Sequence, residues 1–79
     1  MDIKSEYKTK DLAEASFLLV KGKIIQRIER INHVCWFIFQ NELECRRLSD
    51  LFWFGNSTVN GKSFYEAIQT LKNRIFSKR

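Results

Sequence analysis

The first third of the chain contains a stretch whose apolar residues predict a buried helix. Residues Leu12–Lys21 are apolar on nearly every side, which is typical of a helix that is covered all round. Asp11 precedes the stretch and Glu14 follows three residues later, the spacing of a capping box. Gly22 follows the stretch and favours the left-handed conformation that ends many helices. We therefore expect a helix over Leu12–Lys21.

Two strands are predicted next, over Ile24–Ile31 and Val34–Gln40. The first mixes β-branched residues with charges, which is typical of a strand open to solvent on one side. Asn32 and His33 between them predict a hairpin turn, with a weaker signal than Asn-Gly. The second strand does not alternate, since six apolar residues stand consecutively at its start. Either both of its faces are covered, or one face is kept for a partner.

The second half of the chain predicts two further helices. One extends from Glu42 to about Trp53, and its acidic first turn suits the positive end of the helix dipole. The other extends from Gly61 to about Ser77, with Asn60 as its cap. The stripe expected to be buried in the first consists of Cys45, Leu48, Leu51 and Phe52. The stripe of the second, with the clearest helical spacing of the chain, consists of Phe64, Ala67, Ile68, Leu71 and Ile75.

Together these elements predict a small α+β domain in the order helix, β-hairpin, helix, helix (α-β-β-α-α). Residues 1–8 form a polar N-terminal arm or a short edge strand around Tyr7, and residues 9–79 form the single domain. So few residues cover only one face of an antiparallel sheet well, so we expect the helices to pack on one face.

The second strand shows which face that is. Cys35, Phe37 and Phe39 share one face, which we expect the helices to cover, while Trp36 and Ile38 share the other. We expect the face of Trp36 to stay at least partly open and to meet another molecule. The alternative is that the first helix or the N-terminal arm covers it.

Composition narrows the setting. A chain of 79 residues with 44% hydrophobic residues is long enough for one folded domain, and its two cysteines are too few for a disulfide framework. No signal peptide and no run of about 20 apolar residues is present, so we expect no membrane association. We therefore expect a cytoplasmic location with free thiols.

The sequence contains no arrangement of residues that is typical of catalysis or metal binding. Five residues separate Gly55 from Gly61, where a phosphate-binding P-loop needs four. His33 with the two cysteines lacks the paired spacing of a zinc site. One histidine and scattered carboxylates do not assemble a nucleophile, a base and an oxyanion site. We therefore expect no enzyme, no cofactor and no small-molecule substrate.

The net charge of +5 is unevenly distributed, and residues 60–79 alone carry +4. A polyanion suits such a surface, and cations beside an aromatic ring are what nucleic acid needs, for phosphates and for base stacking. The predicted nucleic-acid-binding residues, for DNA or RNA, are Lys23, Arg27, Arg30, Trp36, Lys62, Lys72, Arg74, Lys78 and Arg79. A solvated helix face plus a core tryptophan would explain the same residues without any ligand.

A second hypothesis is a protein-interaction or homodimerisation module with no nucleic-acid role. The doubly apolar second strand and the pair Trp53-Phe54 at a helix end favour it. An apolar sheet face invites pairing with a second copy, and we expect that contact through the face of Trp36 and Ile38.

The order of several fold-determining residues resembles a family of short, uncharacterised bacterial and archaeal domains, over about residues 7–76. The residues that carry the resemblance are Tyr7, Thr9, Asp11-Leu12, Gly22, Ile28-Glu29-Arg30, Phe37, Phe39, Phe52, Gly55, Val59-Asn60, Phe64, Ala67-Ile68 and Leu71-Lys72. This chain has Gly61 where the family often has proline, and both are tolerated at a helix start. The resemblance implies a shared fold and brings no catalytic residues.

Overall fold

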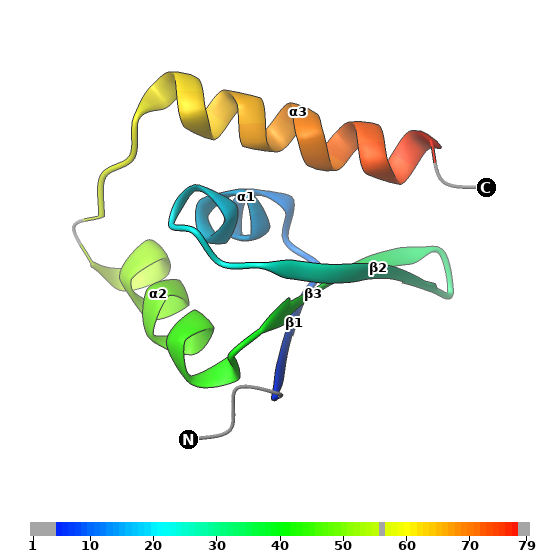
Figure 1. Ribbon diagram of the computed structural model, residues 1–79, viewed down its shortest axis with the longest axis horizontal. Helices are drawn as coiled ribbons and strands as arrows, with labels where there is room; N and C mark the ends of the chain where they lie inside the picture. The colour runs from blue at the N-terminus through cyan, green and yellow to red at the C-terminus, as the bar shows by residue number, and fades with distance from the viewer. Residues whose placement is uncertain (1–4, 56, 78–79) are drawn as a thin grey trace.

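The structure, a computed structural model, describes residues 5–55 and 57–77 and contains three helices and one three-stranded sheet (Figure 1). The elements in chain order are β1 (Glu6–Thr9), α1 (Leu12–Val20), β2 (Ile25–Ile31), β3 (Val34–Gln40), α2 (Glu42–Phe54) and α3 (Gly61–Ser77). The predicted α+β class is confirmed, as is the order of a helix, a hairpin and two helices. The predicted element boundaries agree with these to within one residue, β1 apart.

β3 is the central strand of the sheet, with an edge strand on each side. The strand order is β1-β3-β2, and both pairings are antiparallel. Tyr7 of β1 lies opposite Phe39, and Ile28 of β2 lies opposite Phe37. For residues 1–8 the sequence allowed either a polar arm or a short edge strand. The structure shows an edge strand over Glu6–Thr9, and residues 1–4 lie outside the described residues.

A β-bulge in β2 decides which of its side chains face the helices. The register shifts between Ile25 and Arg27, so that β2 has one extra residue relative to β3. Ile25 and Ile28, three residues apart, can therefore both contribute to the helix-covered face, where Ile28 is 8% exposed. Arg27 turns to the opposite face, opposite Ile38.

The predicted turn at Asn32-His33 joins the two strands. The φ angles of Asn32 and His33 are 51° and 70°, and positive values at both central positions are what a type I′ hairpin turn requires. This turn matches the right-handed twist of the flanking strands, which is why a two-residue connection suffices here.

The helix ends follow the caps that the sequence predicts. Asp11 accepts a hydrogen bond from the backbone N–H of Glu14 at 2.8 Å, and Asn60 accepts one from Ser63 at 2.9 Å. Gly22 has a φ of 89°, which glycine adopts without the strain of a Cβ. The capping box is incomplete, because the carboxylate of Glu14 turns inward instead of back to the N-cap.

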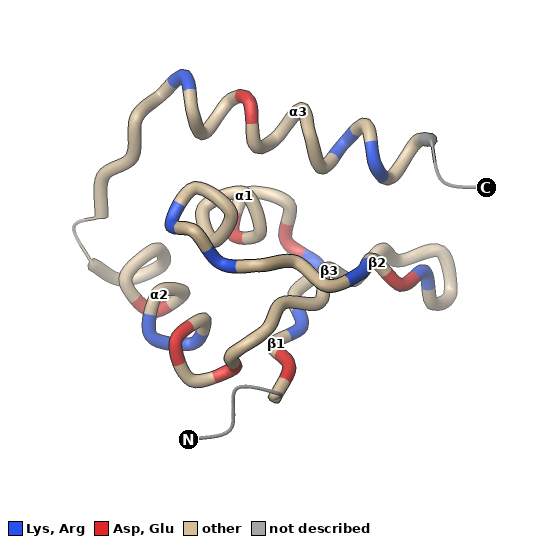
Figure 2. The backbone as a smooth tube through the Cα atoms, viewed as in Figure 1, with Lys and Arg blue, Asp and Glu red and all other residues tan. Residues whose placement is uncertain are grey.

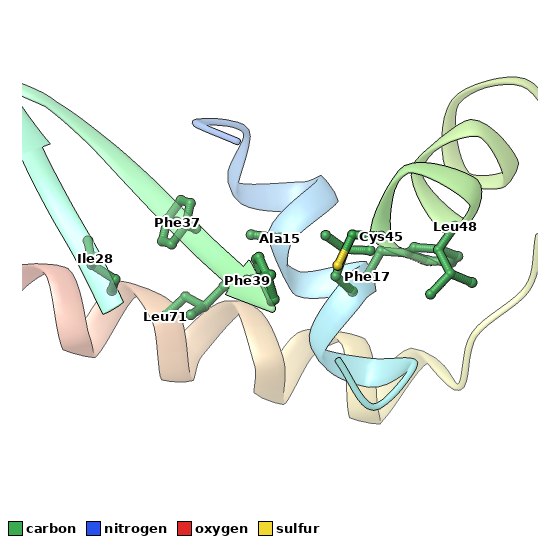
Figure 3. Packing of buried hydrophobic residues seen from close by; sticks show 9 residues of the cluster. Ala15, Phe17, Ile28, Phe37, Phe39, Cys45, Leu48 and Leu71 are labelled. Atoms are coloured by element: carbon green, nitrogen blue, oxygen red, sulfur yellow. The ribbon is translucent and has the colours of Figure 1, made fainter. Parts of the chain in front are cut away.

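The core lies between the helices and one face of the sheet. Phe37 and Phe39 of β3 are 1% or less exposed, and they contact a cluster to which all three helices contribute (Figure 3). Phe17 of α1 and Phe52 of α2 lie with ring centroids 5.1 Å apart. The prediction that the helices cover the face of Phe37 and Phe39 is therefore confirmed.

One predicted core position is wrong. Leu51 of α2 is 41% exposed, whereas its neighbours Leu48 and Phe52 pack in or against the core. Successive residues on a helix diverge by about 100°, so the residue before Phe52 points toward the solvent side of α2. The predicted stripe of α3 is borne out at Leu71, which is 1% exposed, and at Phe64 and Ile75, which pack against the core.

Candidate nucleic-acid interface

The second face of the sheet carries no helix among the residues that the structure describes (Figure 1). The strand register places nine side chains on it, and none belongs to the core cluster. We call this surface the open sheet face; its residues are Glu6, Lys8, Arg27, Glu29, Ile31, Val34, Trp36, Ile38 and Gln40. Lys10, which follows β1, extends the row of Glu6 and Lys8.

Ile38 lies at the centre of the open sheet face but is not exposed. Its exposed fraction is 0%, so the expectation that Ile38 is available to a second copy is wrong. Lys8 of β1 and Arg27 of β2 stand directly opposite it on the two edge strands. Directly opposed side chains on a sheet lie within contact distance, and the aliphatic stems of lysine and arginine cover apolar surface well.

Arg27 is held by two carboxylates. Its Nη1 lies 2.7 Å from Oε2 of Glu6, and its Nε lies 2.7 Å from Oε2 of Glu29. The hydrogen bonds that Arg27 donates to Glu6 and then to Glu29 raise the pKa of the guanidinium, and the bonds that Glu6 accepts from Arg27 lower the pKa of Glu6. Because two negative charges already surround it, Arg27 offers little net attraction to a phosphate.

Trp36 lies on the open sheet face and is neither fully buried nor fully exposed. Glu29 is its neighbour on β2, and Nζ of Lys10 lies over the ring at 5.9 Å from the centroid. This contact is a cation–π interaction, which holds the lysine nitrogen over the ring. An aromatic ring on a central strand next to a cation is an arrangement that binds unpaired bases.

Lys8 and Lys10 are exposed cations on this face that the sequence reasoning missed. Within residues 5–55 and 57–77, neither forms an ion pair with a carboxylate. The signal was present, because Lys8 and Lys10 alternate with the inward-facing Tyr7 and Thr9, the period of a strand. A polar segment of four residues, however, predicts a strand only weakly.

We expected Lys23 and Arg30 to lie near Trp36, but neither of them does. Lys23 precedes β2, and its Nζ lies 4.0 Å from Oε1 of Glu44. Arg30 stands opposite Cys35 on the helix-covered face, where its Nη2 donates to the backbone oxygen of Ile75 at 3.2 Å. Arg30 thereby satisfies a carbonyl in the last turn of α3, where a cation also suits the helix dipole.

The predicted cations of α3 do not form one surface. Lys62 is at the start of α3, while Lys72 and Arg74 are near its end, and the blue segments of α3 in Figure 2 are separated in the same way. Lys72 and Arg74 are two residues apart and therefore point about 160° away from each other. Nζ of Lys62 lies 3.9 Å from Glu66. Lys78 and Arg79 lie outside the described residues.

A buried carboxylate fastens β1, the strand that carries Lys8, to the helices. Glu14 of α1 is 4% exposed and accepts hydrogen bonds from Tyr7 at 2.6 Å, from Thr9 at 2.7 Å and from Ser49 of α2. Burial acts to raise its pKa, but the three hydroxyl groups outweigh that effect and leave the pKa below its usual value. Glu14 therefore stays ionised and positions the strand.

The two cysteines are free thiols in different surroundings. Cys35 is half-buried on β3, and Cys45 of α2 is 0% exposed, with its Sγ donating to the backbone oxygen of Gln40 at 3.3 Å. Burial raises the pKa of the Cys45 thiol to about 11. Among the residues that the structure describes, no three His, Cys, Asp or Glu side chains are grouped to hold a metal ion. None of the described helices has the length and apolar content that a membrane crossing needs.

A comparison with known protein families shows which family the chain belongs to. The family model described as "Domain of unknown function (DUF5659)" matches residues 4–77, nearly the whole sequence. The chain belongs to the DUF5659 family. This confirms the resemblance to an uncharacterised family, while the bacterial and archaeal origin of its members stays a prediction. No curated protein and no solved structure matched this DUF5659 domain.

Proposed function

We propose that this DUF5659 domain binds single-stranded nucleic acid across its open sheet face. Trp36 stacks a base, and Lys8 and Lys10 contact the phosphates on either side. The observation that carries the proposal is the position of the partly exposed Trp36 on a central strand, on the face that the helices leave free, with Nζ of Lys10 at 5.9 Å from the ring centroid.

A single strand suits this face better than a duplex. Unpaired bases can leave the stack and lie on an aromatic side chain, whereas duplex bases are already stacked. Lys8 and Lys10 are two residues apart on an extended segment, so their attachment points are about 7 Å apart along it. A row of cations beside a ring follows a flexible backbone without reading its sequence. The proposal includes no reaction, and free thiols suit a reducing compartment such as the cytoplasm.

The stacking part of the proposal is tested with Trp36→Phe and Trp36→Ala. Binding of fluorescein-labelled oligo(dT) and oligo(U) is measured by fluorescence anisotropy at low salt. Stacking contributes about 1–3 kcal/mol per base, so Trp36→Ala should weaken binding roughly 5- to 150-fold. Trp36→Phe keeps a ring and should retain most of the affinity. Equal losses in both variants, with the fold intact by circular dichroism, would contradict stacking.

The phosphate contacts are tested through salt dependence. For single strands, each phosphate contact contributes about −0.7 to the slope of log K against log salt concentration. Lys8→Ala/Lys10→Ala should therefore flatten the slope by about 1.4. The matched control Lys72→Ala/Arg74→Ala removes the same charge from α3 and should leave the slope nearly unchanged. A larger effect of the α3 pair, or no binding by the unaltered protein, would refute the proposed interface.

Arg27 provides a second control within the open sheet face. The guanidinium of Arg27 is already paired with two carboxylates. We therefore expect Arg27→Gln to change the salt slope less than the replacement of Lys8 and Lys10 does. The fold of this variant is checked by thermal unfolding, because Arg27 also stands beside the buried Ile38.

A protein-interaction role is the second candidate function. A separate observation favours it: the outer side of α2 exposes large apolar side chains, with Phe54 at 87% and Leu43 at 64%. This surface shares no residue with the open sheet face.

A further inference from the structure

The helix α2 has apolar residues on two sides. Cys45, Leu48 and Phe52 pack in or against the core, as an amphipathic helix requires. On the opposite side, Leu43 is 64% exposed and Phe54 is 87% exposed. Burial of the first stripe explains why α2 packs against the rest of the domain. It does not explain why large apolar side chains lie on the solvent-facing side of the helix.

The exposed side of α2 has a regular order. Leu43, Arg47, Asp50 and Phe54 are spaced four, three and four residues apart, so all four lie on one narrow stripe of the helix. Along this stripe an apolar residue is followed by a cation, an anion and a second apolar residue. The order reads the same from either end, except that the two charges exchange places. An antiparallel copy of the helix therefore presents the complementary pattern.

We infer that α2 is a homodimer interface, in which two copies of the helix pair antiparallel about a two-fold axis. The axis passes the helix at the level between Leu48 and Ser49. Leu43 then lies level with the partner subunit's Phe54, and Arg47 lies level with the partner subunit's Asp50. Two-fold interfaces are isologous, so each of these contacts forms twice.

The charges on the stripe favour a second copy over another apolar partner. Nη2 of Arg47 lies 2.9 Å from Oε1 of Glu44 on its own helix. The Arg47 side chain is 60% exposed, so the guanidinium can also pair with a second carboxylate. Within the described residues, Asp50 forms no ion pair. In the dimer, each Asp50 gains the partner subunit's Arg47 at the centre of the interface. Complementary charges of this kind fix the orientation and the register of a helix pair.

The size of the interface predicts a weak dimer. α2 has 13 residues and is therefore about 20 Å long, so one pair of such helices forms a contact smaller than that of permanent complexes. We expect a reversible monomer–dimer equilibrium with a dissociation constant in the micromolar to submillimolar range. Below it, the isolated domain is monomeric.

The first experiment is sedimentation equilibrium of the full chain from micromolar to millimolar concentration. We expect a concentration-dependent shift from monomer to dimer, which Phe54→Asp and Leu43→Asp abolish. Tyr65→Asp is the matched control, since Tyr65 is a large side chain on α3 that is 62% exposed, and it should leave the equilibrium unchanged. A protein that stays monomeric at millimolar concentration overturns the inference. So does a dimer that both α2 variants preserve.

The second experiment exchanges the central charges and tests the antiparallel register. Asp50→Arg places two cations opposite each other at each contact, and Arg47→Asp places two anions there, so each variant alone should be monomeric. Mixing the two restores opposite charges at both contacts, and we expect a heterodimer in native mass spectrometry. If the mixture does not associate while the unaltered protein does, this register is wrong. Circular dichroism of each variant verifies that the fold is retained.

Discussion

Arg27 of β2 and Glu6 of β1 are joined across the central strand of the sheet. Nη1 of Arg27 lies 2.7 Å from Oε2 of Glu6, although β3 separates the two strands in the sheet. Ile38 of β3 stands opposite Arg27 and is 0% exposed, on a face that no described helix covers. The ion pair therefore belongs to the group of side chains that covers Ile38 and keeps it away from water on the outer surface of the sheet.

This relationship predicts that the arginine stem matters more for stability than its charge. Exposed ion pairs contribute little because solvent screens them and two long side chains must be ordered. Arg27→Met keeps apolar cover over Ile38 and should lower the thermal unfolding midpoint only slightly. Arg27→Ala removes the cover and should lower the midpoint several-fold more. Differential scanning calorimetry measures the unfolding midpoints of both variants. Equal decreases in the midpoint would mean that the ion pairs, and not the arginine stem, provide the stabilisation.

The buried carboxylate of Glu14 predicts a loss of stability in acid. Hydrogen bonds hold its pKa below the usual value in the folded state. Its contribution is therefore present above the unfolded pKa of about 4.3 and is lost as pH falls through the lower folded pKa. Glu14→Gln should lower the free energy of unfolding by about 1–3 kcal/mol at neutral pH, because its hydroxyl partners lose an acceptor.

Urea unfolding at pH 7 and at pH 3 measures this effect. The difference between the unaltered protein and Glu14→Gln should shrink at the lower pH, because the contribution of the ionised carboxylate is lost as pH falls below the unfolded pKa and toward the lowered folded pKa. Glu66→Gln on the exposed side of α3 is the control and should show little difference at either pH. A constant difference between the two proteins across this range would mean that folding does not lower the pKa of Glu14.

The sequence predicted those features whose cause is local or periodic. The helix caps, the hairpin turn and the burial of Phe37 and Phe39 each follow from residues within one element. The network around Glu14 was missed because its partners Tyr7 and Ser49 are brought together only by the fold. The spacing of Glu14 from Asp11 looked instead like a local capping box.

The candidate site was predicted only in part, for similar reasons. Trp36 was identified correctly as a residue of the face that the helices leave uncovered. The burial of Ile38 depends on side chains of both edge strands, and the bulge that brings Arg27 to this face depends on the register with β3. Neither can be read from the spacing within a single strand. Summed charge drew attention to residues 60–79, whereas the lysines beside Trp36 lie near the other end of the chain.

The two thiols should differ strongly in reactivity. The thiolate is the reactive form, and the pKa of Cys45 near 11 leaves very little of it at pH 8. We expect Cys35 to react readily with iodoacetamide, while the Cys35→Ser variant, which retains only Cys45, reacts at least about a hundredfold more slowly. Addition of denaturant should remove the difference. Mass spectrometry over time measures both rates, and fast labelling of Cys45 under native conditions would contradict its burial.

The hairpin turn predicts a substitution that stabilises the protein. His33 adopts a φ of 70° in the connection between β2 and β3, where a side chain is strained by roughly 1–2 kcal/mol. His33→Gly relieves this strain and creates the Asn-Gly pair that type I′ turns favour, but glycine costs about 0.5–1 kcal/mol in chain entropy. We expect a net gain of about 0.5–1 kcal/mol in the free energy of unfolding, measured by urea titration. The matched control is Gly22→Ala, at a φ of 89° with no atom within 4 Å of an added Cβ, which should lower stability through backbone strain alone. A loss of stability in His33→Gly would show that the imidazole makes a contribution larger than the strain it imposes.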